Sequence, residues 1–370
     1  MSTRTLAPSP PASRRGDTGS AVAEIRARLA RLGLLADGHG DEFDESVDRA
    51  VRHFQQERGI AIDGIVGPQT FRRLEEARWR LGDRVLAYLP GHPVVGDDVL
   101  TLQERLAGLG FSPGRPDGIF GRNTDHAVRE FQLNTGLVTD GTAGPETFRA
   151  LARLARTVSG GASTQLREQQ AFDVLRTGVT HKVVLIDAGP DRISRGHRAM
   201  GLTEEDIASD IAARVEGRLA ALGTTVLVTG PARVGHTSFD EGARAAIAND
   251  VGADVVVSLH CDAHDNPQAS GVAAFYFGTD SGRTSSVAGR ALAELLLDEI
   301  SVRTPARACC AQPKTWDLLR LTRMPCVHLD LGYLTNADDA ARLGDPSGRD
   351  ATAKAITAAL IRFFAPPPQD

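Results

Sequence analysis

Apolar residues recur at helical spacing along the first half of the chain. Val22, Ile25, Leu29 and Leu32 mark one face of a helix that Gly33 ends. A second helix and a third helix opened by proline are expected to follow. The residues that indicate them are Val47, Ala50, Val51 and Phe54, the stop near Gly59, the start at Gly67-Pro68, and Phe71 and Leu74 facing inward. The pattern therefore predicts a unit of three helices.

The same unit returns at an offset of 77 residues without a gap. The offset maps residues 50–55 onto 127–132, where five of the six residues are identical and only His53 is replaced, by Glu130. Other matches are Leu29, Leu32 and Gly33 with Leu106, Leu109 and Gly110, Asp63-Gly64 with Asp140-Gly141, and Gly67-Pro68 with Gly144-Pro145. Many matches in one register indicate an internal duplication.

From residue 181 the pattern changes to short apolar runs that alternate with helical segments. Expected strands are 183–186, 226–228, 255–259, 273–277 and 327–331, and expected helices are 203–222, 241–249, 285–301 and 351–364. This alternation predicts an α/β domain with a largely parallel sheet covered on both faces.

These patterns predict a multidomain chain. Two all-α three-helix bundles are expected at 16–80 and 92–156, and the α/β domain at 181–365. Residues 1–15 are rich in Pro, Ser and Arg and are expected to be disordered. Ser159-Gly160-Gly161 begins the linker expected over 157–180, and residues 366–370 form a short tail.

Composition narrows the classes of function. The net charge of −5 and the absence of a block of like charge argue against a nucleic-acid partner. No run of 18 apolar residues occurs, so no transmembrane segment is expected. The N-terminus lacks the apolar core of a secretory signal peptide. The four cysteines show neither a C-x-x-C pair nor the spacing of a disulfide scaffold, which favours reduced thiols and a cytoplasmic location.

The second helical unit carries a recognisable motif. Its residues are Asp117-Gly118-Ile119-Phe120-Gly121, then the helix at 127–132, then Asp140-Gly141 and Gly144-Pro145. The motif resembles the peptidoglycan-binding module found beside many wall enzymes. The resemblance implies binding of peptidoglycan or its precursors, with Asp117, Gly118, Phe120 and Gly121 as ligand-binding residues.

The first unit departs from this motif, because residues 40–44 read Gly-Asp-Glu-Phe-Asp. The second unit is therefore expected to carry most of the affinity. The alternative is that both units are protein-interaction bundles, since the motif residues are chiefly core and turn formers.

Four segments of the α/β domain carry residues suited to metal-assisted hydrolysis. They are Asp187-Ala188-Gly189-Pro190-Asp191, Glu204-Glu205-Asp206, Ser258-Leu259-His260-Cys261-Asp262, and the run from Leu329 to Asn336. Together they resemble the N-acetylmuramoyl-L-alanine amidase family, which cleaves the bond between the muramic acid lactyl group and the first L-alanine of the stem peptide. The resemblance implies Glu204 and His260 as zinc ligands and Asp330 at the position of the general base. A catalytic zinc uses three protein ligands and one open position for water.

Two of the four segments depart from the family pattern. Pro190 stands at the first zinc ligand and offers no donor atom, and Asp330 replaces a glutamate that is one methylene longer. His197, seven residues after Pro190, is the candidate for a substitute ligand. The alternatives are that Glu204 is a first-turn acid favoured by the helix dipole and that His260 is a hydrogen-bonded structural histidine. The expected cofactor is zinc in an incomplete site, with hydrolysis weak or lost.

The run from Thr315 to Pro325, continuing to Tyr333, adds a narrower resemblance. It is similar to the CwlM proteins, which are amidase-like, lack a complete zinc site and act inside the cell. This implies a cytoplasmic regulator that activates MurA, the enzyme committing UDP-N-acetylglucosamine to wall synthesis, under the control of a serine/threonine protein kinase. Trp316 and Arg320 are the expected interface residues, with core packing as the alternative. For the whole protein the alternative is an active zinc-dependent N-acetylmuramoyl-L-alanine amidase that hydrolyses the muramoyl–L-alanine bond in peptidoglycan.

Overall fold

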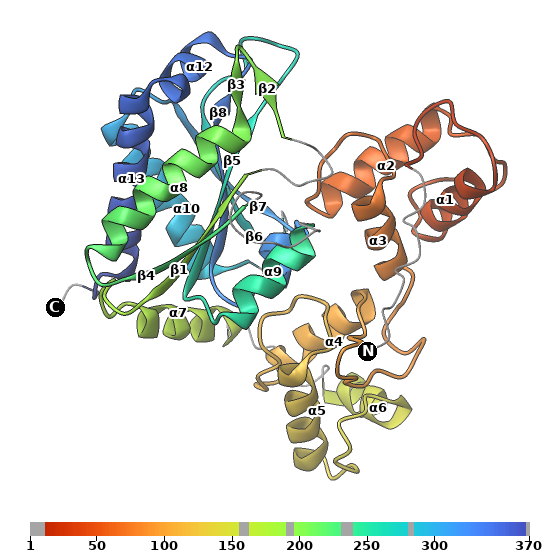
Figure 1. Ribbon diagram of the computed structural model, residues 1–370. Coiled ribbons are helices and arrows are strands. Elements are labelled where there is room, and N and C mark those ends of the chain that lie inside the picture. Colours follow the sequence, from red (N-terminus) through yellow and green to blue (C-terminus); the bar gives the residue numbers. More distant parts are fainter. Residues whose placement is uncertain (1–11, 155–162, 190–195, 231–239, 280–284, 368–370) are drawn as a thin grey trace, which may run out of the picture. The chain divides into compact units, whose positions relative to one another are not determined.

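The computed structural model describes residues 12–154, 163–189, 196–230, 240–279 and 285–367 (Figure 1). The chain forms two compact units, Met1–Thr164 and Gln165–Asp370. The first unit is helical, and the second contains the sheet that the sequence predicts. Among the residues that the structure describes, none of the helices combines the length and the apolar character needed to cross a membrane.

The first helical module has the three helices that the sequence predicts. They are α1 (Ser20–Arg31), α2 (Glu45–Glu57) and α3 (Pro68–Glu76). Their apolar faces form one core, in which the side chains of Leu29, Val47 and Val51 are fully buried. Asp44 caps α2, because its carboxylate accepts hydrogen bonds from the first backbone N–H groups of the helix.

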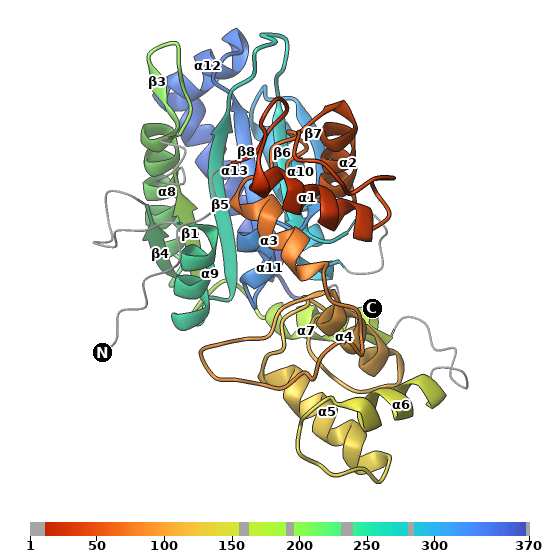
Figure 2. The same cartoon turned by 90° about the vertical axis from the view of Figure 1, so that its right-hand side faces the viewer.

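The second helical module repeats this arrangement with α4 (Asp97–Gly108), α5 (Arg122–Asn134) and α6 (Pro145–Leu154), grouped together in Figure 2. Its core also takes in residues before the expected start at 92, because Leu86 is fully buried and pairs with Ala143. Ser13 pairs in the same way with Val66 of the first module. Residues 12–15 are therefore held in place, whereas residues 1–11 of the expected disordered segment lie outside the described residues.

The second unit is built on a six-stranded sheet of order β4-β1-β5-β8-β6-β7. Its strands are β1 (Val183–Ala188), β4 (Thr225–Thr229), β5 (Val255–Asp262), β6 (Val272–Phe277), β7 (Ala308–Lys314) and β8 (Cys326–Tyr333). Strands β4, β1, β5 and β8 are parallel, β6 is antiparallel to β8, and β7 is parallel to β6. The prediction of a largely parallel sheet is confirmed. A small hairpin, β2 (Arg198–Ala199) and β3 (Leu202–Thr203), precedes the first long helix.

The two faces of the sheet are covered differently. Three long helices pack on one face: α8 (Glu204–Ala220), α10 (Val287–Arg303) and α13 (Pro346–Phe364) (Figure 1). The short helices α9 (Glu241–Asp250) and α11 (Asp317–Leu321) pack on the other, which we call the site face, and α12 (Ala337–Gly344) follows β8. Side chains alternate between faces along each strand, so Val255, Val257 and Leu259 of β5 meet the long helices. The residues between them face the other way.

The stretch in which the linker is expected, 157–180, contains a helix. Helix α7 (Ser163–Leu175) occupies this stretch and places Phe172 in the core of the second unit. The Phe172 and Phe363 rings lie 5.0 Å apart, and Arg176 donates a hydrogen bond to the backbone carbonyl of Ala365. Burial of one aromatic ring therefore ties this segment to the α/β unit. Residues 155–162, including the Ser-Gly-Gly sequence, lie outside the described residues.

Candidate functional site

Polar side chains form two rows across the site face. The strand register aligns Thr229 of β4, Asp187 of β1, Ser258 of β5 and His328 of β8 in the first row, and His260 of β5 with Asp330 of β8 in the second. Figure 2 shows β5, β8 and β6 side by side. Residues two apart on a strand share a face, so Ser258 and His260 point to the same side. The register thus gathers residues that lie far apart in the sequence.

Asp187 is the centre of a buried ion pair in the first row. Its Oδ2 lies 2.8 Å from Arg244 Nη1 of α9, and the two side chains are 2% and 5% exposed. The hydroxyl groups of Thr229 and Ser258 donate to the same carboxylate at 2.8 and 2.5 Å. Burial raises the pKa of Asp187, but the charge of Arg244, the charge of His260 and the two hydroxyl hydrogen bonds together outweigh burial and hold this pKa below its usual range. The pair joins the end of β1 to α9.

Glu204 and His260 contact each other directly. His260 Nδ1 lies 2.9 Å from Glu204 Oε1, and the two side chains are 13% and 3% exposed. The other ring nitrogen, Nε2, lies 2.8 Å from Ser258 Oγ. Glu204 is the first residue of α8, and its Oε2 accepts a hydrogen bond from the backbone N–H of His197. Burial raises the pKa of Glu204, yet the hydrogen bonds from His260 and the His197 backbone, with the charges of both histidines, together outweigh burial and lower this pKa.

Asp330 is bonded to a second histidine on its own strand. His328 Nε2 lies 2.9 Å from Asp330 Oδ1, and the His328 ring stacks on the His260 ring with centroids 4.0 Å apart. Burial raises the pKa of Asp330, but the charge and hydrogen bond of His328, with the charges of His260 and His197, together outweigh burial and the pKa stays below its usual range. Both predicted site residues on β5 and β8 are therefore engaged with neighbouring side chains.

Glu204 and His260 are the described residues placed to hold a zinc ion. Two zinc donors in a tetrahedral site lie about 3.3 Å apart, so the 2.9 Å between Glu204 Oε1 and His260 Nδ1 is close to that spacing. His197, the expected substitute, is about half exposed, and its Nε2 lies 3.7 Å from Asp262 Oδ1. In the described ranges no three His, Cys, Asp or Glu side chains are grouped as a metal site requires. Pro190 lies outside the described residues. Among the residues that the structure describes, Glu204 and His260 therefore supply two of the three protein ligands that a catalytic zinc site uses.

Trp316 is the residue before α11, and Arg320 lies within this helix. The Trp316 ring is partly buried, with its centroid 4.8 Å from that of Phe275 and 4.7 Å from that of His328. Arg320 is buried, with 7% of its surface exposed. The Trp316 ring thus packs against a core cluster beside Phe275 and His328, which fits core packing, the alternative to the predicted interface role.

The turn before α5 is held from inside the second helical module. Gln103 of α4 donates to Asp117 Oδ1 at 3.0 Å, and its side-chain oxygen accepts the Gly118 N–H at 2.8 Å. The Phe120 side chain is fully buried, and Gly121 is the residue before α5. These four residues, expected to bind a ligand, thus make the internal contacts that form the turn.

The same contact occurs at two further Asp-Gly turns of the helical modules. Gln55 holds Asp63 and Gly64, and Gln132 holds Asp140 and Gly141, with the same donor and acceptor atoms. A buried glutamine side chain that hydrogen-bonds both residues of an Asp-Gly turn is therefore a recurring structural motif of these modules.

The first copy replaces this contact at one place. Arg26 stands where the second copy has Gln103, and its guanidinium donates to the backbone carbonyls of His39 and Glu42 at 2.7 and 3.0 Å. It also pairs with the Asp44 carboxylate at 2.9 Å. Arg26 thus fixes the segment before α2 through backbone carbonyl groups, where Gln103 fixes the segment before α5 through an Asp-Gly turn. Phe43 is fully buried, as its counterpart Phe120 is.

Sequence reasoning did not find Arg244, Ser258 or His328 as members of the site. Ser258 and His328 each interrupt an apolar strand, and Arg244 is a buried charge on a short helix. A polar residue inside an apolar strand was the available signal, because a buried polar group needs a hydrogen-bonding partner. The partner itself depends on strand register.

Comparison with known proteins agrees with this architecture. Residues 184–362 match the family of N-acetylmuramoyl-L-alanine amidases, and residues 18–74 and 95–151 match the family of peptidoglycan binding domains. A solved structure, the N-acetylmuramoyl-L-alanine amidase AmiC2 of Nostoc punctiforme, is 26% identical and aligns with 49% of this chain and 96% of its own, with a TM-score of 0.44.

Two curated relatives extend the comparison. The N-acetylmuramoyl-L-alanine amidase CwlL of Bacillus licheniformis is 31% identical over 164 residues, which cover 39% of this chain and 46% of that protein. The N-acetylmuramoyl-L-alanine amidase CwlM of Mycobacterium tuberculosis (strain ATCC 25618 / H37Rv) is 43% identical over 369 residues, which cover 95% of this chain and 89% of the relative. With two peptidoglycan-binding modules ahead of an amidase domain and a match along nearly its whole length, the chain belongs to the N-acetylmuramoyl-L-alanine amidase family and is closely related to CwlM.

Proposed function

We propose that this chain is a cytoplasmic regulator of wall-precursor synthesis, which activates MurA under the control of a serine/threonine protein kinase and has little or no hydrolytic activity. Its helical modules supply affinity for peptidoglycan or its precursors. The observation that supports the proposal is that Glu204, His260 and Asp330, on three of the four segments that resemble the amidase family, are bonded to other side chains of this chain.

These contacts oppose metal-assisted hydrolysis in two ways. His260 and Glu204 bind each other, so a metal ion would have to replace an existing contact of 2.9 Å in a nearly buried place. Asp330, at the position of the general base, is bonded to His328. A carboxylate held by a histidine and kept ionised is a poor donor for the later proton-transfer step. The side chain is also one methylene shorter than the glutamate of the family pattern.

Two further features support a regulator inside the cell. The four cysteines carry free thiols, two of them exposed on β7, which fits a reducing compartment. The run from 315 to 333 resembles the CwlM proteins, and the 43% identity to a CwlM along 95% of the chain is consistent with that resemblance.

The second candidate function is zinc-dependent cleavage of the muramoyl–L-alanine bond in peptidoglycan. The observation that favours it is the spacing of Glu204 and His260, which is close to that of two zinc ligands. The backbone N–H of His197 donates a hydrogen bond to Glu204 Oε2, and in this candidate function the His197 side chain would be the third ligand.

One set of measurements separates the two candidates. MurA turnover is measured with and without the full chain, before and after treatment with the kinase, and the same preparations are assayed for zinc content and for release of stem peptide from muropeptides. The regulator predicts a change in MurA turnover, substoichiometric zinc and no peptide release. Unchanged MurA turnover in every combination, together with peptide release, would favour the hydrolase and reject the regulator.

A matched pair of variants strengthens this test. Glu204→Gln removes a candidate zinc ligand, whereas Glu205→Gln makes the same change one residue along α8. For a regulator, Glu204→Gln should retain the effect on MurA. For a hydrolase, Glu204→Gln should lose both zinc and peptide release, and Glu205→Gln should keep both.

A further inference from the structure

Two of the four cysteines lie next to each other on β7. Cys309 and Cys310 are exposed and carry free thiols, whereas Cys261 and Cys326 are buried. β7 stands at the end of the strand order, so one of its edges is not covered by another strand of this sheet. Both thiols are therefore open to ions and small molecules in solution.

An irregularity in the strand pairing decides which way these thiols face. The pairs on either side of the cysteines are Val272 with Ala308 and Ala274 with Ala311. Two residues of β7, Cys309 and Cys310, thus stand opposite the single residue Ala273 of β6. Two residues opposite one is the arrangement of a β-bulge, which interrupts the regular alternation of side chains along the strand.

The bulge turns both thiols toward the site face. Val272 and Ala274 of β6 pack against the long helices, and the side chains of paired residues point to the same face. Their two partners on β7 therefore face the long helices as well. Cys309 and Cys310 lie between those partners, each next to one of them, so each cysteine faces the other way.

Gln312 gives an independent check on this facing. Its partner on β6 is Phe275, which packs in the core of the site face. Gln312 Nε2 donates a hydrogen bond to Cys310 Sγ at 3.1 Å, so the amide and this thiol share one face. The contact also gives the Cys310 sulfur a hydrogen-bond donor, which stabilises negative charge on the sulfur once the thiol has lost its proton.

Two adjacent thiols on one face are better placed to share an ion than to form a disulfide. The Cα atoms of adjacent residues are about 3.8 Å apart across a trans peptide. Most disulfides join Cα atoms that are about 4.4–6.8 Å apart, so a bond between these two sulfurs would be strained. An ion between the sulfur atoms avoids that strain, because the two atoms need not come within bonding distance.

The number of available ligands selects the ion. Thiolates favour soft ions, among them monovalent copper, zinc and the iron of iron–sulfur clusters. Zinc and iron–sulfur clusters take three or four protein ligands. In the part of the chain that the structure describes, no third His, Cys, Asp or Glu joins these two thiols to form such a group. Monovalent copper has a filled d shell and accepts two thiolates on opposite sides, so two ligands are sufficient.

We propose that Cys309 and Cys310 bind one monovalent copper ion between their sulfur atoms. Each thiol releases its proton to solvent and each sulfur donates an electron pair to the copper, so the complex carries one negative charge. Copper stays monovalent throughout, and no oxidant or reductant is consumed. The Gln312 amide remains hydrogen-bonded to the Cys310 sulfur, and hydrogen bonds of this kind raise the metal affinity of a site.

This site is separate from the residues that resemble the amidase family. Ala273 pairs with Asp330 on the side opposite the cysteines, so two strand spacings of about 4.8 Å each lie between Asp330 and the thiols. Neither candidate function assigns a role to the two thiols. Copper binding can therefore succeed or fail independently of MurA activation and of peptide release.

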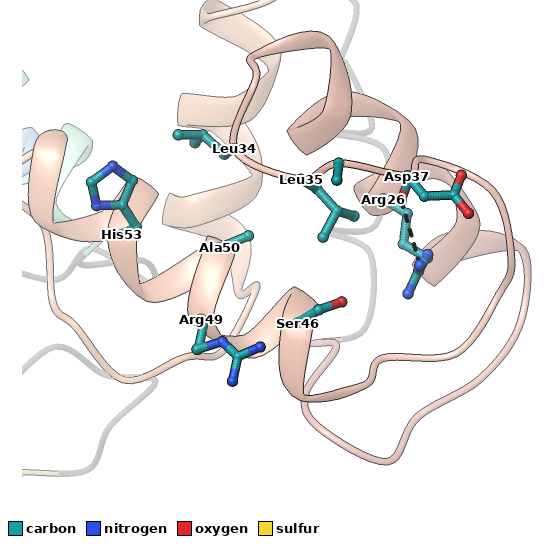
Figure 3. A pocket seen from close by; sticks show the side chains of 9 residues that line it. Arg26, Leu34, Leu35, Asp37, Ser46, Arg49, Ala50 and His53 are labelled. Atoms are coloured by element: carbon teal, nitrogen blue, oxygen red, sulfur yellow. Dashed lines mark hydrogen bonds between the residues drawn. The ribbon is translucent and has the colours of Figure 1, made fainter.

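The first helical module offers a control site of different chemistry. A pocket of about 420 Å³ lies there between the segment that follows α1 and one side of α2, and Figure 3 shows His53 and Asp37 among its lining side chains. The His53 side chain is 59% exposed. Imidazole and carboxylate ligands suit harder ions than monovalent copper. The variant His53→Ala therefore measures how much copper an exposed histidine binds.

The test is a titration of the reduced full chain with monovalent copper in the absence of oxygen, in competition with the chelator bicinchoninate. We expect one copper ion per chain, and X-ray absorption at the copper edge should find sulfur ligands only. Failure of the chain to take copper from the chelator, nitrogen or oxygen ligands in the absorption spectrum, or displacement of copper by equimolar divalent zinc each overturns the proposal.

Two serine variants locate the site. Both thiols are exposed, so Cys309→Ser and Cys310→Ser should leave the fold intact, which circular dichroism verifies. Each should raise Kd for copper at least about a hundredfold, because a single thiolate cannot hold the ion from two sides. His53→Ala should leave Kd unchanged. Tight binding that persists in either serine variant, or that is lost in His53→Ala, overturns the assignment.

Discussion

The buried pair of Asp187 and Arg244 allows a quantitative test of the site. Removing one partner of a buried ion pair costs about 3–5 kcal/mol of folding free energy, because the other charge is left without its counterion. Asp187 also accepts hydrogen bonds from the hydroxyl groups of Thr229 and Ser258, so Asp187→Ala leaves further polar groups without a partner. We expect Asp187→Ala at the upper end of this range and Arg244→Ala near its lower end.

The double variant distinguishes a coupled pair from two separate effects. Because neither charge remains in Asp187→Ala/Arg244→Ala, its loss of stability should be smaller than the sum of the single losses by at least about 2 kcal/mol. The measurement is hydrogen exchange of peptides from β1 and β5 in the full chain, which reports on the α/β unit alone. Single effects that add within about 0.5 kcal/mol would refute the coupling.

The same carboxylate has a predictable pH dependence. The pKa of Asp187 is lowered in the folded chain, so the ionised form is the one that the fold stabilises. Its contribution is complete above about pH 4, the usual pKa of an aspartate, and is lost as the pH falls toward the lowered value. Asp187→Asn should therefore flatten the acid limb of the stability curve. An unchanged acid limb in Asp187→Asn would contradict this assignment.

Three further predictions concern other parts of the chain. Gln55→Leu removes the hydrogen bonds that this buried amide makes with the turn at Asp63–Ile65 and with Thr70, and should destabilise the first module by about 3 kcal/mol. Gln56→Leu, the same change at an exposed neighbour, should have little effect in hydrogen exchange of residues 45–76. Phe172→Ala should cost the α/β unit about 3 kcal/mol, and Val174→Ala, 76% exposed, almost nothing in denaturant unfolding. Basic neighbours, first among them Lys354, lower the pKa of Asp350 to about 2, so NMR titration should find this carboxyl ionised at pH 3.

The sequence by itself determined the elements whose signals are local. The duplicated helices were predictable because apolar spacing, Gly-Pro starts and glycine stops act within a dozen residues. The central strands were predictable because a strand buried on both faces needs a continuous apolar run. Strand β7 carries no such signal, since Ala308–Lys314 is largely exposed at the edge of the sheet. Helix α7 was missed because one buried ring, Phe172, fixes it.

Only the tertiary structure decided the composition of the site. Family resemblance indicated Glu204, His260 and Asp330 as separate site residues. The side chains that they contact, such as Ser258 and His328, depend on how β1, β5 and β8 are aligned. That register places Ser258 beside Asp187 and His328, residues separated by about 70 positions in either direction along the chain. The facing of Cys309 and Cys310 likewise depends on how β7 pairs with β6. Contacts between distant segments are set by packing of the whole core, and no local pattern encodes them.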